Sequence, residues 1–230
     1  MAWVYMPEHY KSLVEGFGVC ALLHLPVAHE VVKKMKYLPK ESSVTLESVL
    51  KNRNAYGWCP IRLQCVSFRI GDSGNSTVIP TKNIKPGILY IPTLFEFDVI
   101  DAFYFVEVLR PDTTGDVPKN NSRLTLVFVR VPRERDTALT TSRVAAFIRR
   151  MKECMDGWEQ LTNEIAFEML YLRHTSNVAI NRRQTCALAI GETRREHLEA
   201  HAFWENMEQF EVELGDVLVD TLVNCITERW

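Results

Sequence analysis

The chain has neither a long uninterrupted apolar run nor a paired cysteine motif. Its longest apolar stretch, at 19–27, is interrupted by His24 and Pro26, and it is far shorter than the ~20 residues that a membrane-spanning helix needs. The first ten residues contain Glu8 and no apolar core, so no secretory signal peptide is expected. No C-x-x-C pair occurs among the cysteines, which favours a reducing, intracellular and cytoplasmic location. The cysteines are Cys20, Cys59, Cys65, Cys154, Cys186 and Cys225.

A strong charge of one sign is also missing. The formal net charge is −2, which gives no argument for binding to nucleic acid or to a membrane surface. The apolar fraction of 47% and the charged fraction of 24% are those of an ordinary soluble globular protein. A length of 230 residues suits one large domain or two small ones.

The sequence contains no recognisable catalytic or cofactor-binding motif. There is no G-x-S-x-G segment, and Ser73 lies between Gly71 and Gly74 in a sequence typical of a turn. The glycines are too scattered to form a phosphate-binding loop at the start of a helix. We therefore expect no cofactor and favour a protein that is not an enzyme.

Two segments in the last ninety residues carry apolar side chains in steps of three and four. Because this spacing places side chains on one face of an α-helix, we expect two long amphipathic helices at about 144–172 and 203–225, joined as a hairpin. The hairpin is expected to bury one set of residues against another. The first set is Ile148, Met151, Met155, Leu161 and Ile165, and the second is Phe210, Leu214, Val217 and Leu218.

Gly157 and Gly215 lie inside these two patterns. A glycine costs about 1 kcal/mol relative to alanine inside a helix, so each is either an interior residue or a break between two elements. Thr140 or Thr141 is expected to cap the first helix. The Thr-Arg-Arg-Glu segment at 193–196 matches a capping box that would open the second helix.

Residues 59–131 show the alternation and the aromatic content of β-strands, with strands expected at about 61–70, 87–91, 94–100, 103–109 and 124–131. Short helices are expected before residue 58. The predicted fold class is therefore α+β: a mainly antiparallel sheet, preceded by short helices and packed against the C-terminal hairpin. The charged segment at 132–141 suggests a division into a β-rich part at 1–136 and a helical part at 137–230, packed as one compact unit.

Two groups of residues are candidates for metal chemistry. Glu96, Asp98 and Asp101 lie close together in the β-rich part, as a metal-dependent phosphoesterase or nuclease would need. His197 and His201 are four residues apart on the second predicted helix, which places both rings on one face, as in some zinc sites. Neither group has an obvious further ligand, and acidic or histidine side chains with these spacings are commonly solvated.

Arginines flank the predicted turn of the hairpin and are opposed by an acidic segment. From residue 193 to the end, nine acids face three bases. Arginine binds carboxylates and phosphates through two parallel hydrogen bonds, so the arginines are candidates for contact with an acidic partner surface or with RNA, or they are simply solvated. These arginines are Arg173, Arg182, Arg183, Arg194 and Arg195.

The preferred hypothesis is an assembly or scaffold subunit, such as a structural protein of a capsid, a virion or another large particle. Long amphipathic helices and the aromatic residues Trp3 and Trp230 near the chain ends favour contacts with copies of itself or with a larger protein assembly. The alternatives are a metal-dependent phosphoesterase or nuclease and an RNA-contacting subunit of a ribonucleoprotein particle.

Overall fold

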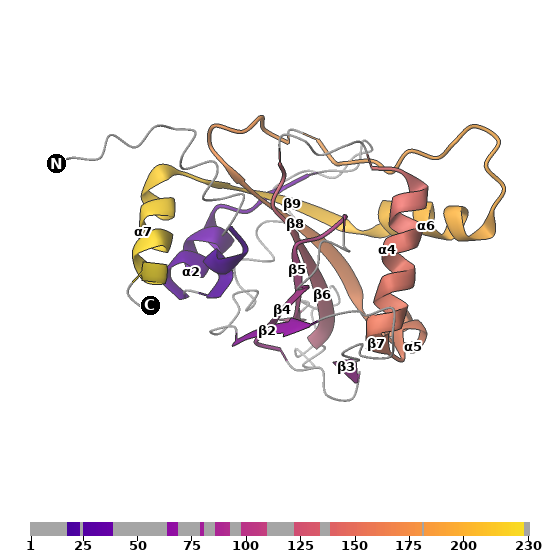
Figure 1. Ribbon diagram of the computed structural model, residues 1–230, viewed down its shortest axis with the longest axis horizontal. Helices are drawn as coiled ribbons and strands as arrows, with labels where there is room; N and C mark the ends of the chain where they lie inside the picture. Colours follow the sequence, from indigo (N-terminus) through magenta and orange to yellow (C-terminus); the bar gives the residue numbers. More distant parts are fainter. Residues whose placement is uncertain are drawn as a thin grey trace, which may run out of the picture.

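A computed structural model describes residues 18–23, 25–38, 64–68, 79–80, 86–92, 98–109, 122–133, 139–180 and 182–227. Within these residues, a seven-stranded mixed sheet lies at the centre of the molecule (Figure 1). In spatial order its strands are β1 (Lys36–Tyr37), β9 (Glu208–Leu214), β8 (Ala166–His174), β6 (Ser122–Arg130), β5 (Ala102–Leu109), β4 (Ile88–Pro92) and β2 (Gln64–Phe68). A second, two-stranded sheet pairs β3 (Ile79–Pro80) with β7 (Met155–Asp156).

The middle of the sheet is the antiparallel ladder of β5 and β6, which runs from Ala102 opposite Val129 to Leu109 opposite Ser122. β4 also pairs with β5 in the antiparallel sense. The expectation of strands at 87–91, 103–109 and 124–131 is confirmed, as is the mixed α and β content. In the whole sheet, three neighbouring pairs are antiparallel and three are parallel.

β6, β8 and β9 run parallel and are joined by crossover connections. The first crossover contains α4 (Thr141–Cys154) and α5 (Trp158–Glu164), and the second contains α6 (Arg195–Asn206). Two crossovers of the same hand that step in the same direction place their helices on the same face of a sheet. Figure 1 shows α4, α5 and α6 together on one side of the sheet.

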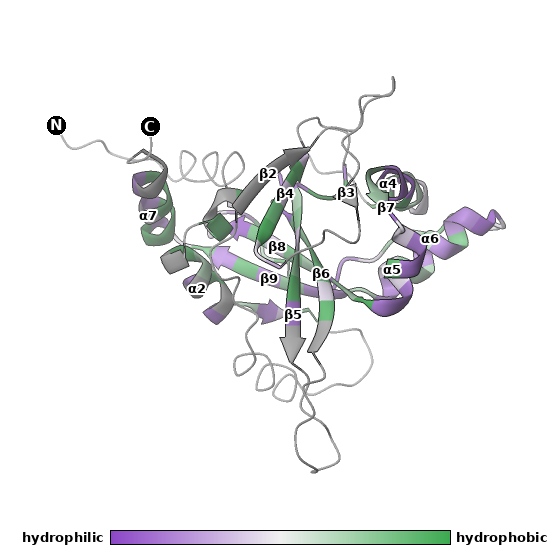
Figure 2. Cartoon of the chain, turned by 90° about the horizontal axis from the view of Figure 1, so that it is seen from below, coloured by the Kyte–Doolittle hydropathy of each residue, from purple (hydrophilic) through white to green (hydrophobic). Residues whose placement is uncertain are grey.

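The opposite face is covered by α7 (Asp216–Thr227), α2 (Leu25–Lys33) and the 3-10 helix η1 (Gly18–Leu23). The sheet is therefore buried on both faces, and successive residues of β6 enter different cores. Phe128 packs with the helices of the crossovers, whereas Val127 and Val129 pack with α2 and α7. Figure 2 shows hydrophobic residues concentrated on the central strands and hydrophilic residues on α6.

The predicted helical hairpin is wrong. The first expected helix is divided into α4, β7, α5 and β8, and the second into α6, β9 and α7. The two glycines mark breaks: Gly157, with φ 75°, precedes α5, and Gly215 separates β9 from α7. Strands buried on both faces carry apolar residues at nearly every position, and such a run also satisfies a helical spacing.

The predicted packing between the two apolar stripes is wrong for the same reason. Met151 and Met155 lie in the core on one face of the sheet, whereas Phe210 and Leu214 lie in the core on the other face. Val217 is 80% exposed.

The expected helical caps are confirmed for only one of the two helices. The Thr140 side chain accepts a hydrogen bond from the backbone N–H of Arg143 at the start of α4. The N-cap of α6 is Arg194, without a side-chain cap, so the expected capping box of Thr193 and Glu196 is absent.

The N-terminal expectations are only partly covered by the described residues. Of the short helices expected before residue 58, α2 at Leu25–Lys33 lies within the described residues, while most of that segment lies outside them. The proposed division at 136/137 falls between β6 and β8, which are neighbours in one sheet.

Candidate functional site

The connection from β8 to α6 is the most unusual element of the fold. It spans residues 175–194, and its described residues, all but residue 181, contain no helix and only one isolated β-bridge. Loops longer than about 12–15 residues without secondary structure are uncommon in compact domains and are usually functional. We call this segment the β8–α6 loop and take it as the candidate functional site.

The first part of the β8–α6 loop is held by a buried ionic cluster at the end of β8. Arg173 Nε donates to Oε1 of Glu211 at 2.5 Å, and the guanidinium also pairs with Glu213. The same arginine donates to the carbonyl oxygen of Asn177, and the backbone N–H of Ile180 donates to Glu211 at 2.7 Å. Side chains of β9 therefore determine the path of the loop as it leaves the sheet.

The middle of the loop is held by a polar network beneath α6. The amide side chain of Gln209 accepts from the backbone N–H of Gln184 and donates to its carbonyl oxygen, both at 2.9 Å. Trp204 Nε1 donates to the same carbonyl at 2.8 Å. Gln209 and Trp204 are almost completely buried, so the loop backbone is part of the core at this point.

The last part of the loop joins the start of α4 and then turns outward. Ala187 exchanges backbone hydrogen bonds with Leu139 and Thr141, each at 3.1 Å. Beyond this bridge, the backbone N–H of Glu192 donates to the carbonyl of Ala189, and Gly191 adopts a φ of 75°. Glycine occupies this left-handed region without a steric penalty.

Glu192 fixes the outward turn to α6. Its carboxylate accepts from the backbone N–H of Arg194 at 2.8 Å and from the ring of His197 at 2.7 Å. The backbone hydrogen bond from Arg194, followed by the hydrogen bond from His197, lowers the pKa of Glu192 below its usual range. The carboxylate is thus ionised where the helix N-terminus favours negative charge.

The turn carries apolar side chains into solvent. Ile190 has a relative exposure of 107%, and Leu188 and Leu198 on either side are 38% and 44% exposed. We call these three residues with the 189–194 backbone the apolar turn. It is held in place by the contacts of Ala187 and Glu192, so its exposed side chains are presented on an ordered scaffold.

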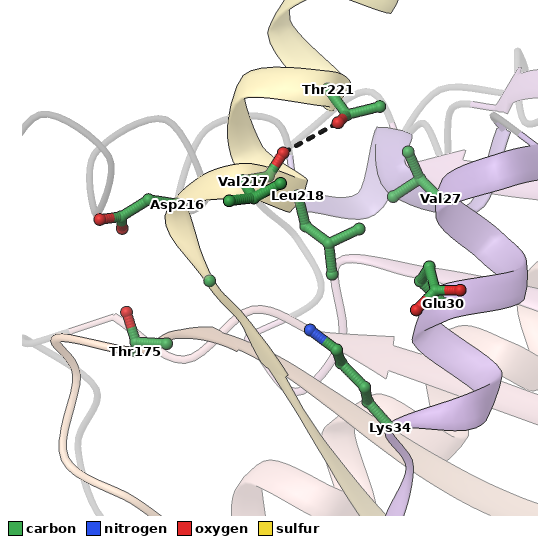
Figure 3. Close-up of a pocket in the computed structure, with 9 residues that line it drawn as sticks. Val27, Glu30, Lys34, Thr175, Asp216, Val217, Leu218 and Thr221 are labelled. Atoms are coloured by element: carbon green, nitrogen blue, oxygen red, sulfur yellow. Dashed lines mark hydrogen bonds between the residues drawn. The ribbon is translucent and has the colours of Figure 1, made fainter.

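A pocket of about 680 Å³ lies between α2 and α7 at the carboxyl ends of β8 and β9. Ligands of α/β sheets commonly bind at this edge. The Lys34 ammonium and the Thr175 hydroxyl point toward the space below the first turn of α7 (Figure 3). The full lining is Val27, Glu30, Lys34, Thr175, Gly215, Asp216, Val217, Leu218 and Thr221.

Beside the pocket, His174 connects the end of β8 to the start of α7. Its Nε2 lies 2.9 Å from Oδ1 of Asp216, and its Nδ1 lies 2.7 Å from Oγ of Ser176. The chain of contacts from Ser176 through His174 to Asp216 resembles a serine–histidine–aspartate triad. Ser176, however, also donates its backbone N–H to the same Nδ1 of His174. This is the geometry of a local turn, and Ser176 does not line the pocket. We assign His174 to anchoring α7.

The structure does not gather the five predicted arginines into one surface. Arg173 and Arg183 are buried, with 5% and 6% relative exposure, and both bind groups of the chain itself. Arg182, Arg194 and Arg195 are exposed, and Arg195 pairs with Glu199 at 2.6 Å. Only these last three are accessible to a partner. The acidic segment is likewise divided among α6, β9 and α7.

The candidate metal ligands also serve other contacts. Glu96 lies outside the described residues, and Asp98 is exposed in a turn. Asp101 accepts from the backbone N–H of Val131 and from Arg133, each at 2.7 Å. The described residues include no group of three or more His, Cys, Asp or Glu side chains that could hold a metal ion.

The two helical histidines are in different environments. His197 is buried against Glu192, and His201 is half-buried.

Burial raises the pKa of the Cys154 thiol to about 12 and that of the Cys186 thiol to about 11. The reactive form of cysteine is the thiolate, so neither cysteine is prepared for nucleophilic chemistry.

The sequence reasoning missed both the apolar turn and the pocket. Each lies beside a glycine, a residue that signals a turn or a break between elements: Gly191 follows Ile190, and Gly215 precedes α7.

Within the described part of the chain, no helix combines the length and apolar composition that a bilayer crossing requires. Compared with protein-family models, with curated proteins and with solved structures, the chain has no match in any of the three.

Proposed function

We propose that this protein is a non-enzymatic assembly subunit that acts through protein–protein contacts with copies of itself in a reducing, intracellular particle of the capsid, matrix or scaffold type. The observation that carries the proposal is the apolar turn. Ile190 is fully exposed there, between Leu188 and Leu198, on a backbone that is tied to the sheet, to α4 and to α6.

Exposed apolar side chains on an ordered scaffold favour an interface. Five large apolar side chains are exposed in the described part of the chain, and three of them belong to the apolar turn. Leu188 and Ile190 are two residues apart in the same ordered segment, and exposed apolar residues that lie together commonly mark a contact surface. Side chains that become fully buried at the centre of an interface contribute more to affinity than polar groups at its rim.

The charged residues support an interaction role over a chemical one. Two of the five arginines that were candidates for RNA contact are used inside the fold, and Asp101 of the acidic trio stabilises the end of β6. These groups therefore have structural functions that need neither a metal ion nor RNA.

The test is the oligomeric state of the full chain. Size-exclusion chromatography with light scattering, over a concentration series, should show self-association of the wild-type protein. Ile190→Asp should weaken it at least about tenfold, because burying an unpaired carboxylate in an interface costs more than the ~1.4 kcal/mol that a tenfold change represents. Val178→Asp is the matched control, since Val178 is 92% exposed on the same loop but lies outside the apolar turn. A wild-type protein that stays monomeric throughout would overturn the proposal.

A further inference from the structure

We infer that the apolar turn of one copy packs against the apolar turn of a second copy across a two-fold axis. The inference rests on the proposed function and names the partner surface, which is the same surface of the other copy. It follows from the position of the exposed apolar side chains and from two side chains of opposite charge at the start of α6.

The apolar surface of the turn is sufficient for a two-fold contact. In such a contact both copies present the same surface, so one apolar group on each copy provides both halves. Ile190, at 107% relative exposure, is the most exposed of the large apolar residues in the described part of the chain. Val217 lies on α7, which Figures 1 and 2 place at the end of the molecule opposite α6, so it does not belong to this surface.

Several charged groups of the turn and of the first part of α6 already have partners in the same chain. The carboxylate of Glu192 accepts from the backbone N–H of Arg194 and from the ring of His197. The guanidinium of Arg195 pairs with Glu199 at 2.6 Å. These groups therefore need no partner from a second copy.

The side chains of Arg194 and Glu196 carry the remaining charges. Arg194 is exposed, and within the described residues its guanidinium forms neither a hydrogen bond nor an ion pair. Glu196 keeps 66% of its side chain exposed, and its carboxylate lies 3.8 Å from the ring of His197, beyond hydrogen-bond distance. The two side chains are opposite in charge and only two residues apart, so the surface beside the apolar turn is complementary to itself.

A two-fold contact pairs these charges reciprocally. When one residue of the first copy meets a second residue of the other copy, the symmetry forms the same pair again with the copies exchanged. Arg194 of each copy thus meets Glu196 of the other, and the Ile190 side chains are buried between the copies. Opposite charges at the rim of an interface select the partner, whereas like charges in contact weaken binding.

Charge reversal tests the reciprocal pair. Arg194→Glu leaves only carboxylates at the two positions, and Glu196→Arg leaves only guanidinium groups. Each variant alone should therefore self-associate at least about tenfold more weakly than the wild type. Mixed in equal amounts, with a fluorescent label on one variant, they should form a one-to-one heterodimer, because each contact then joins opposite charges. Both substitutions in one chain should restore self-association.

The matched control is Lys34→Glu. It makes the same change of charge as Arg194→Glu at an exposed position directly after α2, and it should associate like the wild type. Light scattering and sedimentation velocity measure the association, and circular dichroism checks that every variant is folded.

A disulfide provides a second readout, because a two-fold axis beside the turn brings identical positions together. Under mild oxidation, Ile190→Cys should form a covalent dimer through residue 190 of both copies. Val178→Cys should not, although Val178 is 92% exposed on the same loop. Mass spectrometry of the cross-linked peptide identifies the position of the bond.

The outcomes distinguish this inference from the proposed function. A wild-type protein that stays monomeric overturns both. If the wild type associates but the mixed charge variants associate no better than either variant alone, the two-fold contact is overturned and the assembly function stands. Single charge variants that associate like the wild type, or an Ile190→Cys protein without a covalent dimer, overturn the two-fold contact in the same way.

Discussion

Two adjacent arginines show how differently the fold uses the same residue type. Arg183 donates from its guanidinium to the carbonyl oxygens of Trp204 and Glu205, at 2.7 and 2.8 Å, near the end of α6. Desolvation by burial lowers the pKa of Arg183, and the nearby carboxylate of Glu205 acts in the opposite direction. A cation at the last turn of a helix satisfies carbonyl groups that have no partner within the helix. Arg182 is exposed, and among the described residues its side chain caps no helix.

Replacing these arginines should therefore have unequal effects. Arg183→Met leaves buried carbonyl oxygens at the end of α6 without a donor and should lower the free energy of unfolding by about 1–3 kcal/mol. Arg182→Met changes an exposed position and should stay within about 0.5 kcal/mol of the wild type. Urea denaturation followed by circular dichroism measures both. Equal losses for the two variants would mean that Arg183 does not cap α6.

At the scale of single elements, the apolar turn depends on the ionised form of Glu192. Because folding lowers the pKa of this carboxyl, the folded turn favours the carboxylate. Its stabilising contribution is complete above the ordinary value of 4.5 and is lost as the pH falls through the lowered folded pKa. Acidification should therefore loosen the turn that presents Ile190.

The backbone amide of Arg194 reports this change directly, since it donates to Glu192 at 2.8 Å. In an NMR titration, its chemical shift should move with a midpoint below pH 4.5. In Glu192→Gln the movement should disappear, because an amide side chain does not titrate in this range. A midpoint at or above pH 4.5 in the wild-type protein would contradict the hydrogen-bonded turn.

The elements also show how far the sequence is informative. Strands such as β5 and β6 are predictable because aromatic and β-branched residues occupy both faces between polar loops. β8 is not, because Met169 and Leu172 continue the helical spacing that begins in α4. Spacing alone does not separate a buried strand from a buried helix, and Gly157 was the better guide.

The candidate site was less predictable than the fold, since its geometry comes from partners distant in sequence. Arg173 lies inside the fold because Glu211, 38 residues later, lies on the neighbouring strand. No local pattern distinguishes it from the exposed Arg194. The exposure of Ile190 likewise results from the bridge at Ala187, which directs the chain away from the sheet.

At the scale of the whole molecule, one sheet contains strands from both proposed parts of the chain. β6 belongs to residues 1–136 and pairs with β8 of residues 137–230 from Thr125 opposite Ala166 to Arg130 opposite Tyr171. Each part buries its apolar surface against the other. Phe128 of β6, for example, stacks on Phe167 of β8 with ring centroids 6.1 Å apart.

A fragment of residues 137–230 should therefore not fold on its own. Without β6, β8 has an unpaired edge in the centre of the sheet, and both cores lose their central strands. We expect narrow amide dispersion in its NMR spectrum and no cooperative thermal transition, whereas the full chain should show wide dispersion and a cooperative transition. A cooperative transition of the fragment would establish it as an independent domain.

The short strand β1 adds a constraint during synthesis on the ribosome. Tyr37 pairs with Phe210, which the ribosome adds 210 − 37 = 173 residues later. At about 5–20 residues per second, β1 waits roughly 9 to 35 seconds for its partner. During that interval the ring of Tyr37, which later packs 5.4 Å from that of Phe210, has no aromatic neighbour on β9. The nascent chain thus leaves the Tyr37 ring without its β9 partner for most of its elongation.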